Sequence, residues 1–274
     1  MNFNEGEDEG IKSLVKAGSE MTGGAIGAVI GFLFAGPDGA AIGGASAPLL
    51  TRGIIEIGND IAERFLSERE KIRIGEVIIF AAKKILEKLA AGEKLRDDGF
   101  FEQPSTGHPA CAEIQTIERP PDKEVIEGFL LAVQREHEEK KLLFIGNLLA
   151  NIFFYPSIDK AQVNLMIRIS KSISYRQLCI LSIFAHTEDF ELRKESYRGH
   201  RNLGVKKISL VQEIADLDTQ GLLNCSGEAL LGLSDVNPSK MKIQGMGVLL
   251  YNLMELWDID ETDIDSIITL LKPE

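Results

Sequence analysis

The chain has 274 residues, of which 44% are hydrophobic and 26% are charged. This balance excludes a disordered protein and allows a large buried core, in two domains or one by length. The net charge of −12 disfavours a broad electrostatic contact with nucleic acid or anionic lipid, although local patches could bind either. The three cysteines, Cys111, Cys179 and Cys225, form no CxxC pair, which is typical of a reducing cytosol.

Residues 1–20 form an acidic tail and a lead-in to a glycine-rich segment. The first ten residues, MNFNEGEDEG, are acidic where a secretory signal peptide would be basic. We therefore expect the protein to be cytoplasmic at first.

Glycine is unusually regular between residues 21 and 58. Gly23, Gly27 and Gly31 are spaced four residues apart. After a turn at residues 36–39, Gly39 and Gly43 have the same spacing. On a helix each set forms a stripe without side chains, and each glycine weakens a soluble helix by roughly 1 kcal/mol relative to alanine. Close helix–helix packing normally offsets this cost. We therefore predict a glycine-zipper helical hairpin that packs or oligomerises through these residues.

The environment of this hairpin stays open at the level of sequence. The uncharged run from Thr22 to Gly36 is shorter than the ~20 residues of a membrane-spanning helix. The hairpin could be buried in a soluble core or a homo-oligomer, lie in a membrane interface, insert after a trigger, or anchor the protein constitutively.

Apolar residues at helical spacing predict one long helix or two from Ile54 to Leu89, divided at the charged stretch 67–73. The hairpin and this helix make up a region 21–91. Residues 92–121 gather glycine and proline and predict a linker, with a short strand at 111–117, and the best domain boundary.

A further helix is predicted to start at the N-cap Asp122 and to end near Pro156. Its charged middle, residues 135–141, should face water or a partner helix. A second helix follows at 160–170. The sequence Ser174-Tyr-Arg-Gln177 is a capping box that opens a third, from Tyr175 to His186.

The remaining segments predict a small α+β part. A polar loop at 187–207 precedes a helix from Leu210 to Gly221, extended segments at 230–233 and 241–243, and a helix from Leu249 to Trp257. A helix, two short extended segments joined by a turn, and a final helix are the outline of a winged-helix domain. We assign residues 122–257 to this helical and winged-helix-like domain, and 258–274 to an acidic C-terminal helix.

Four sequence blocks in this order suggest a family. They are Val125-Ile-Glu-Gly-Phe-Leu130, Leu142-Leu-Phe-Ile-Gly-Asn-Leu-Leu-Ala-Asn-Ile152, Ile173-Ser-Tyr-Arg-Gln-Leu-Cys-Ile-Leu181 and Ile243-Gln-Gly-Met-Gly-Val-Leu-Leu250, and they follow a glycine-rich helical segment. With that segment, the chain resembles the Abi-alpha (abortive-infection alpha) group of bacterial proteins. The resemblance covers residues 20–257 in architecture and implies a role in anti-phage defence by growth arrest or death of the infected cell. It implies no active-site residues.

Enzyme and metal motifs are incomplete. The glycines at 39–44 lack the lysine of a P-loop, and His137 lacks a second histidine four residues later, so we interpret it as a core or interface residue. His108 and Cys111 could make only half of a four-ligand zinc site, so we interpret them as loop residues. The aspartates at 258, 260 and 263 lack the glycine and glutamate of an EF-hand, so we interpret them as helix-dipole partners. We expect no catalytic residue, cofactor or metal.

One basic cluster interrupts the acidic background and could contact phosphate or an anionic lipid, or be a solvated loop. It comprises Arg193, Lys194, Arg198, Arg201, Lys206 and Lys207. The helix after it carries Glu213, Asp216 and Asp218, which would repel phosphates and argue against reading of the DNA major groove.

The sequence thus predicts an all-α protein with a small winged-helix-like C-terminal part and a glycine-zipper hairpin. The expected function is non-enzymatic anti-phage defence, in which the hairpin oligomerises and permeabilises the inner membrane after a phage or host protein triggers it. The alternative is a soluble winged-helix regulator or adaptor that binds nucleic acid or a partner protein.

Overall fold

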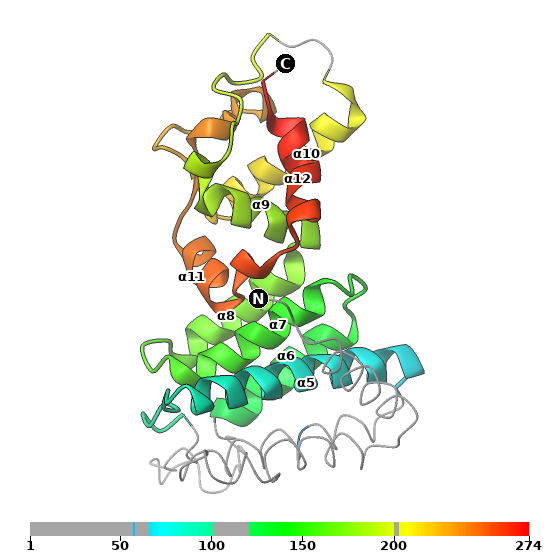
Figure 1. The fold of residues 1–274 in the computed structure, drawn as a ribbon, viewed down its shortest axis with the longest axis vertical. Coiled ribbons are helices and arrows are strands. Elements are labelled where there is room, and N and C mark those ends of the chain that lie inside the picture. Colours follow the sequence, from blue (N-terminus) through cyan, green and yellow to red (C-terminus); the bar gives the residue numbers. More distant parts are fainter. Residues whose placement is uncertain (1–56, 58–65, 101–120, 200–202, 274) are drawn as a thin grey trace, which may run out of the picture. The chain divides into compact units, whose positions relative to one another are not determined.

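The computed structural model describes residues 57, 66–100, 121–199 and 203–273 (Figure 1). The described part is mainly helical, as predicted, with eight α-helices and one two-stranded sheet. The chain divides into two compact units, residues 1–171 and 172–274. This division falls between the predicted helices 160–170 and 175–186, a position that we did not select as a boundary.

The first described helix of unit 1 is α5 (Glu68–Ala90), which starts inside the charged stretch where we divided the predicted helix. A capping box explains the start. The Ser67 hydroxyl accepts a hydrogen bond from the Glu70 amide, and the Glu70 carboxylate accepts one from the Ser67 amide at 2.7 Å. The charged residues beyond it form the first turns of the helix.

The helix predicted from Asp122 to Pro156 is two helices, α6 (Pro121–Gln134) and α7 (Lys141–Asn151), so that prediction was wrong. Glu136 accounts for the break. Its carboxylate accepts hydrogen bonds from the amides of His137 and Glu138, at 2.9 and 3.0 Å, and forms a buried ion pair with Lys141. Local side-chain bonds of this kind compete with the helical pattern.

The same turn corrects our interpretation of His137. Its side chain is 86% exposed in the connection between α6 and α7, so it is not a core residue. Asp122, predicted as an N-cap, lies within the first turn of α6 and is buried.

Helices α5 and α7 approach each other closely at a glycine. A Cβ atom on Gly146 of α7 would lie 2.7 Å from Cβ of Phe80 and 3.3 Å from the carbonyl oxygen of Val77, both on α5. No larger side chain fits without movement of a helix. In this unit the absence of a side chain at one position therefore sets the distance between two packed helices.

Part of the predicted linker packs against η2 (Ile152–Phe154), the 3₁₀ turn that follows α7. The amide of Arg96 donates to the Phe153 carbonyl at 2.9 Å, and its buried guanidinium lies 4.0 Å from the centre of the Phe100 ring and binds Asp98. Residues 92–100 are therefore held in place. The strand predicted at 111–117 lies outside the described residues. Helix α8 (Lys160–Ser172) follows.

The described part of unit 2 contains four α-helices (Figure 1) and a small antiparallel sheet. Its helices are α9 (Tyr175–Ala185), α10 (Gly204–Thr219), α11 (Met246–Leu253) and α12 (Glu261–Leu271). Short 3₁₀ turns occur at η3 (Thr187–Asp189), η4 (Leu233–Asp235), η5 (Pro238–Lys240) and η6 (Leu256–Asp258). Helix α9 contacts α10, α11, α12 and the sheet, so it is central to the unit.

The sheet pairs β1 (Leu223–Cys225) with β2 (Met241–Ile243). The prediction of β2 is confirmed, but the extended segment predicted at 230–233 is wrong, because it lies in the connection between the strands, where Leu231 is 89% exposed. Leu223 and Cys225 are fully buried and take its place.

Helix boundaries also differ from prediction. Helix α10 begins six residues before the predicted Leu210, and α11 ends at Leu253, so Trp257 lies in η6. Gly247 on α11 packs directly on the backbone just before β1, since a Cβ there would lie 2.2 Å from the Leu222 carbonyl oxygen. Asp260 caps α12 by accepting a hydrogen bond from the Thr262 amide at 2.8 Å, which confirms its predicted place at a helix N-terminus.

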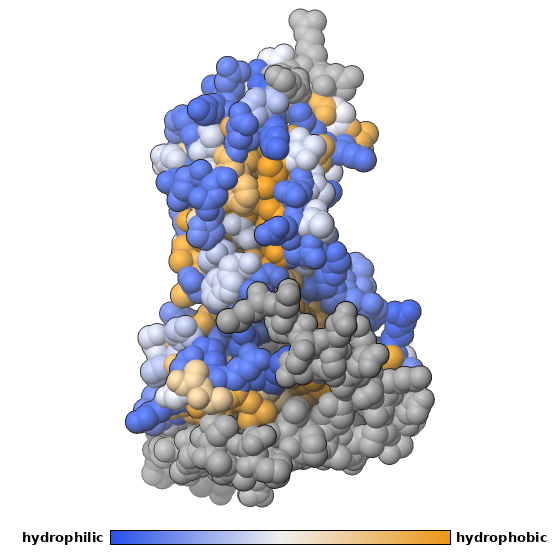
Figure 2. Space-filling model, viewed as in Figure 1, coloured by the Kyte–Doolittle hydropathy of each residue, from blue (hydrophilic) through white to orange (hydrophobic). Residues whose placement is uncertain are grey.

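The visible face of the described residues is mostly hydrophilic, with separate apolar patches (Figure 2). The most exposed large apolar side chains in the described part are Leu231 and Val205, at 89% and 85%. Among residues 57, 66–100, 121–199 and 203–273, none of the helices combines the length and the hydropathy that a membrane span requires.

Candidate functional site

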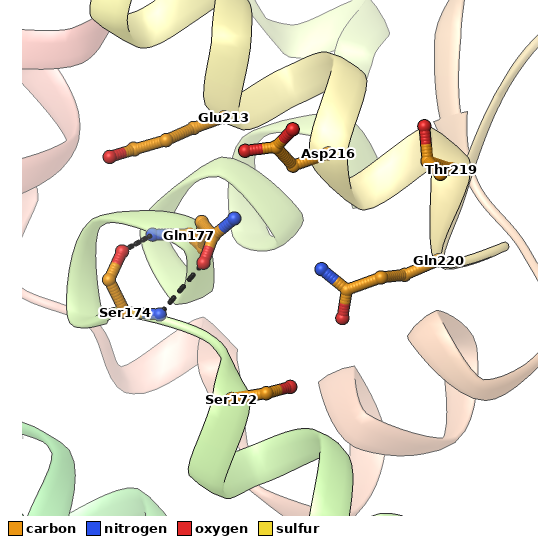
Figure 3. Close-up of a pocket in the computed structure, with 7 residues that line it drawn as sticks. All are labelled: Ser172, Ser174, Gln177, Glu213, Asp216, Thr219 and Gln220. Atoms are coloured by element: carbon orange, nitrogen blue, oxygen red, sulfur yellow. Dashed lines mark hydrogen bonds between the residues drawn. The ribbon is translucent and has the colours of Figure 1, made fainter.

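A polar pocket of about 450 Å³ lies between the first turn of α9 and the second half of α10 (Figure 3). Every residue that lines it belongs to unit 2. The lining consists of carboxylates, amides and hydroxyls, from Ser172, Ser174, Gln177, Glu213, Asp216, Thr219 and Gln220. A pocket of this composition can exchange hydrogen bonds with a ligand that carries both donors and acceptors.

The α9 side of the pocket is fixed by the capping box that the sequence predicted. The Ser174 hydroxyl accepts a hydrogen bond from the Gln177 amide at 3.1 Å, and the Gln177 side-chain oxygen accepts one from the Ser174 amide at 2.8 Å. Gln177 is only 7% exposed. Because its oxygen is held by the cap, its side-chain nitrogen points toward α10, as Figure 3 shows.

The α10 side carries two carboxylates one turn apart. Arg176 binds Glu213 through two parallel bonds, Nε to Oε2 and a terminal nitrogen to Oε1, each 2.7 Å long. Hydrogen bonding to Glu213 raises the pKa of Arg176. Burial acts in the opposite direction but is the weaker effect. Asp216 accepts a bond from Gln212 Nε2 at 2.7 Å through Oδ1. The arrangement therefore neutralises Glu213 and leaves Asp216 as the pocket's unneutralised anion within the described residues.

The basic cluster predicted from the sequence does not form one surface in the described residues. Arg193 is buried, donates to the Glu195 carbonyl oxygen at 3.0 Å and lies over the Tyr197 ring, whereas Lys194 is exposed. Arg198 is exposed and pairs with Asp235 at 2.6 Å.

Two other members of the cluster lie on α10. Lys206 and Lys207 belong to its first turn, where Lys206 is exposed and Lys207 half-buried. Arg201 lies outside the described residues. The zipper glycines Gly23, Gly27, Gly31, Gly39 and Gly43 also lie outside them, as do His108 and Cys111.

Arg198 lines a second, smaller pocket of about 150 Å³ beside the loop between β1 and β2. Two ion pairs border it, Arg198 with Asp235 and Lys240 with Glu228, each 2.6 Å long. Hydrogen bonding from Arg198 lowers the pKa of Asp235. Since each charge is bound by the opposite one, this pocket offers less to a ligand than the pocket between α9 and α10.

Sequence reasoning located Ser174, Gln177, Glu213 and Asp216 but did not bring them together. The capping box identified the first turn of α9, and the acidic face of the next predicted helix was noted as unfavourable for phosphate. That Arg176 binds Glu213 was the missing connection. An arginine inside a capping box, followed by an acidic helix, is a signal that could have found it.

Within the described residues, no group of three histidine, cysteine, aspartate or glutamate side chains is arranged to hold a metal ion. The aspartates before α12 have local roles, as Asp263 accepts a hydrogen bond from the Tyr175 hydroxyl at 2.8 Å. Burial and this bond raise the pKa of Tyr175. Comparison with family models, with curated proteins and with solved structures gave no match.

Proposed function

We propose that this chain is a non-enzymatic bacterial anti-phage protein of the abortive-infection type. In this proposal, the glycine-rich segment 21–58 is the effector and oligomerises through Gly23, Gly27, Gly31, Gly39 and Gly43. Its association with the inner membrane then raises permeability. The regular glycine interval and the order of the four sequence blocks that resemble the Abi-alpha group support this proposal.

The packing of α5 against α7 is the structural observation that best supports this proposal, because two helices of the same chain already pack closely at a glycine. Gly146 lets the two helices approach to a distance that a Cβ atom would prevent. Glycines at every fourth residue would extend the same contact over several turns. Close backbone approach is therefore a packing mode that this protein already uses.

Activation would require a resting form in which the hairpin is packed away. A switch from 1:99 to 99:1 in favour of the active form needs about 5.5 kcal/mol of differential binding. One tight contact with a phage or host protein could supply this. Unit 2, with its polar pocket, is our candidate for the part that senses the trigger.

The test is toxicity and dye entry in cells that express the Gly27→Leu and Gly31→Leu variants, together with membrane fractionation. We expect both variants to lose toxicity and to leave the membrane fraction, since leucine would separate the backbones. Gly232→Leu is the matched control, because a Cβ at Gly232 meets nothing within 4 Å. Unchanged toxicity of the two hairpin variants would reject the zipper mechanism.

A second candidate function is a soluble winged-helix-like regulator that binds nucleic acid or a partner protein. The order α10, β1, the loop at 226–240 and β2 favours it, since that loop has the position of a wing. The Asp216 carboxylate on α10, which no positive side chain neutralises among the described residues, favours a protein partner over nucleic acid. A gel-shift assay tests for nucleic-acid binding, with the unmodified protein and a variant in which Arg198 and Arg201 are replaced by glutamate. If the protein binds nucleic acid, we expect a salt-dependent shift that the replacements abolish. The other hypotheses predict no such shift.

A further inference from the structure

We propose that the pocket between α9 and α10 binds an arginine or lysine side chain on a partner protein, together with a peptide carbonyl next to it. The site would read one basic residue in an extended segment. The binding chemistry follows from the pocket itself, and only its meaning as the trigger site rests on the proposed function.

The first element is a donor on a largely buried side chain, aimed into the pocket. The Gln177 side-chain nitrogen has no hydrogen-bond acceptor among the described residues, although the side chain is more than nine-tenths buried. The Ser174 amide occupies the Gln177 oxygen, so the side-chain amide cannot turn around without loss of the cap. A ligand that brings an acceptor can therefore bind this nitrogen, and a peptide carbonyl is a suitable acceptor.

The second element is an anion on the facing wall. Asp216 uses Oδ1 to bind Gln212, while Oδ2 has no donor among the residues that the structure describes. Asp216 lies near the C-terminus of α10, where the helix dipole favours a positive charge. A guanidinium or ammonium group would form a charge-assisted bond with this carboxylate.

The surrounding groups favour a cation over other ligands. Glu213 on the same wall is matched by Arg176, so the described lining has no unneutralised positive group for a phosphate. The Gln220 amide and the Thr219 hydroxyl add further polar groups. The net charge of −12 also attracts a basic segment over long range. The Asp216 carboxylate can therefore bind the positive side chain of a basic residue, while the Gln177 side-chain nitrogen donates to a backbone carbonyl beside it.

The experiment uses the full chain and two short peptides, acetyl-Gly-Arg-Gly-amide and the same peptide with neutral citrulline in place of arginine. Side-chain amide signals of Gln177 and Gln220 are followed by NMR during titration. We expect the arginine peptide to shift both signals and to bind about tenfold more tightly than the citrulline peptide.

Two variants separate this site from general attraction to an acidic protein. Asp216→Asn removes the anion and keeps an oxygen for Gln212, so it should weaken the arginine peptide by about tenfold. Asp265→Asn on α12 removes the same charge at an exposed position outside the pocket and should change nothing.

Equal weakening by both variants, equal binding of both peptides, or no shift of the Gln177 signal would each overturn the proposal. These outcomes leave the zipper mechanism standing, because it is measured by toxicity and dye entry. Conversely, loss of the zipper mechanism would not move the peptide titration.

Discussion

Single polar side chains decide where several helices of this protein begin. Ser67, Ser174 and Asp260 each accept a hydrogen bond from an amide in the first turn of a helix, and Glu136 does the same for the turn before α7. Such caps contribute about 1 kcal/mol each. At the scale of the residue, helix ends are therefore local chemistry, and the sequence motif at Ser174 predicted one of them correctly.

Glu70 provides a test of this local chemistry by pH. Hydrogen bonds from the Ser67 side chain, the Gln134 side chain and the Ser67 amide lower its pKa to about 2. A lowered pKa stabilises the folded form above the unfolded value of about 4.3, and this contribution is lost as the pH falls toward 2. We expect an NMR titration of the Glu70 carboxyl carbon to show a midpoint near 2.

Ser67→Ala removes the largest cause of that shift and should move the Glu70 midpoint up toward the usual value. Gln134→Leu removes the second cause and should move it in the same direction by less. A midpoint near 4.3 in the unmodified protein would contradict the capping geometry.

At the scale of elements, two glycines with opposite surroundings give a matched comparison. Gly146→Ala places a Cβ 2.7 Å from Phe80 and should destabilise the protein by about 1–3 kcal/mol. Gly75→Ala lies in α5 with nothing within 4 Å and should stabilise it by up to about 1 kcal/mol through helix propensity. Urea unfolding measures both, and an equal effect of the two substitutions would show that α5 and α7 do not pack as described.

How far the sequence predicted the elements depends on the length of the pattern. Long amphipathic runs such as α5 and the capped α9 were predicted correctly. The break between α6 and α7 was missed, because apolar residues continue at helical spacing on both sides and only Glu136 and Lys141 interrupt the backbone pattern.

The short elements were harder for a different reason. Strand β1 has three residues, too few to show an alternation, and its burial comes from contacts with α10 and β2. The pocket was missed for the same reason, since its walls meet only through the fold.

At the scale of the whole molecule, the division at residues 171 and 172 predicts an independent unit. Residues 172–274 have their own core, with Leu178, Leu210, Ile214, Leu223 and Met241 fully buried. We expect this fragment, expressed alone, to unfold in one cooperative thermal transition observed by circular dichroism. Leu178→Ala in the fragment should cost about 2–5 kcal/mol, and a gradual melt without a transition would contradict the division.

The close contact at Gly247 also predicts a sequence feature of any related protein. Since the α11 backbone rests on the Leu222 carbonyl oxygen with no room for even a methyl group, a protein that shares this junction must place glycine there. Distant homologues with little overall sequence similarity should therefore keep a glycine at the start of a short helix just after a two-stranded sheet. This position can be used as a motif in searches of genome sequences.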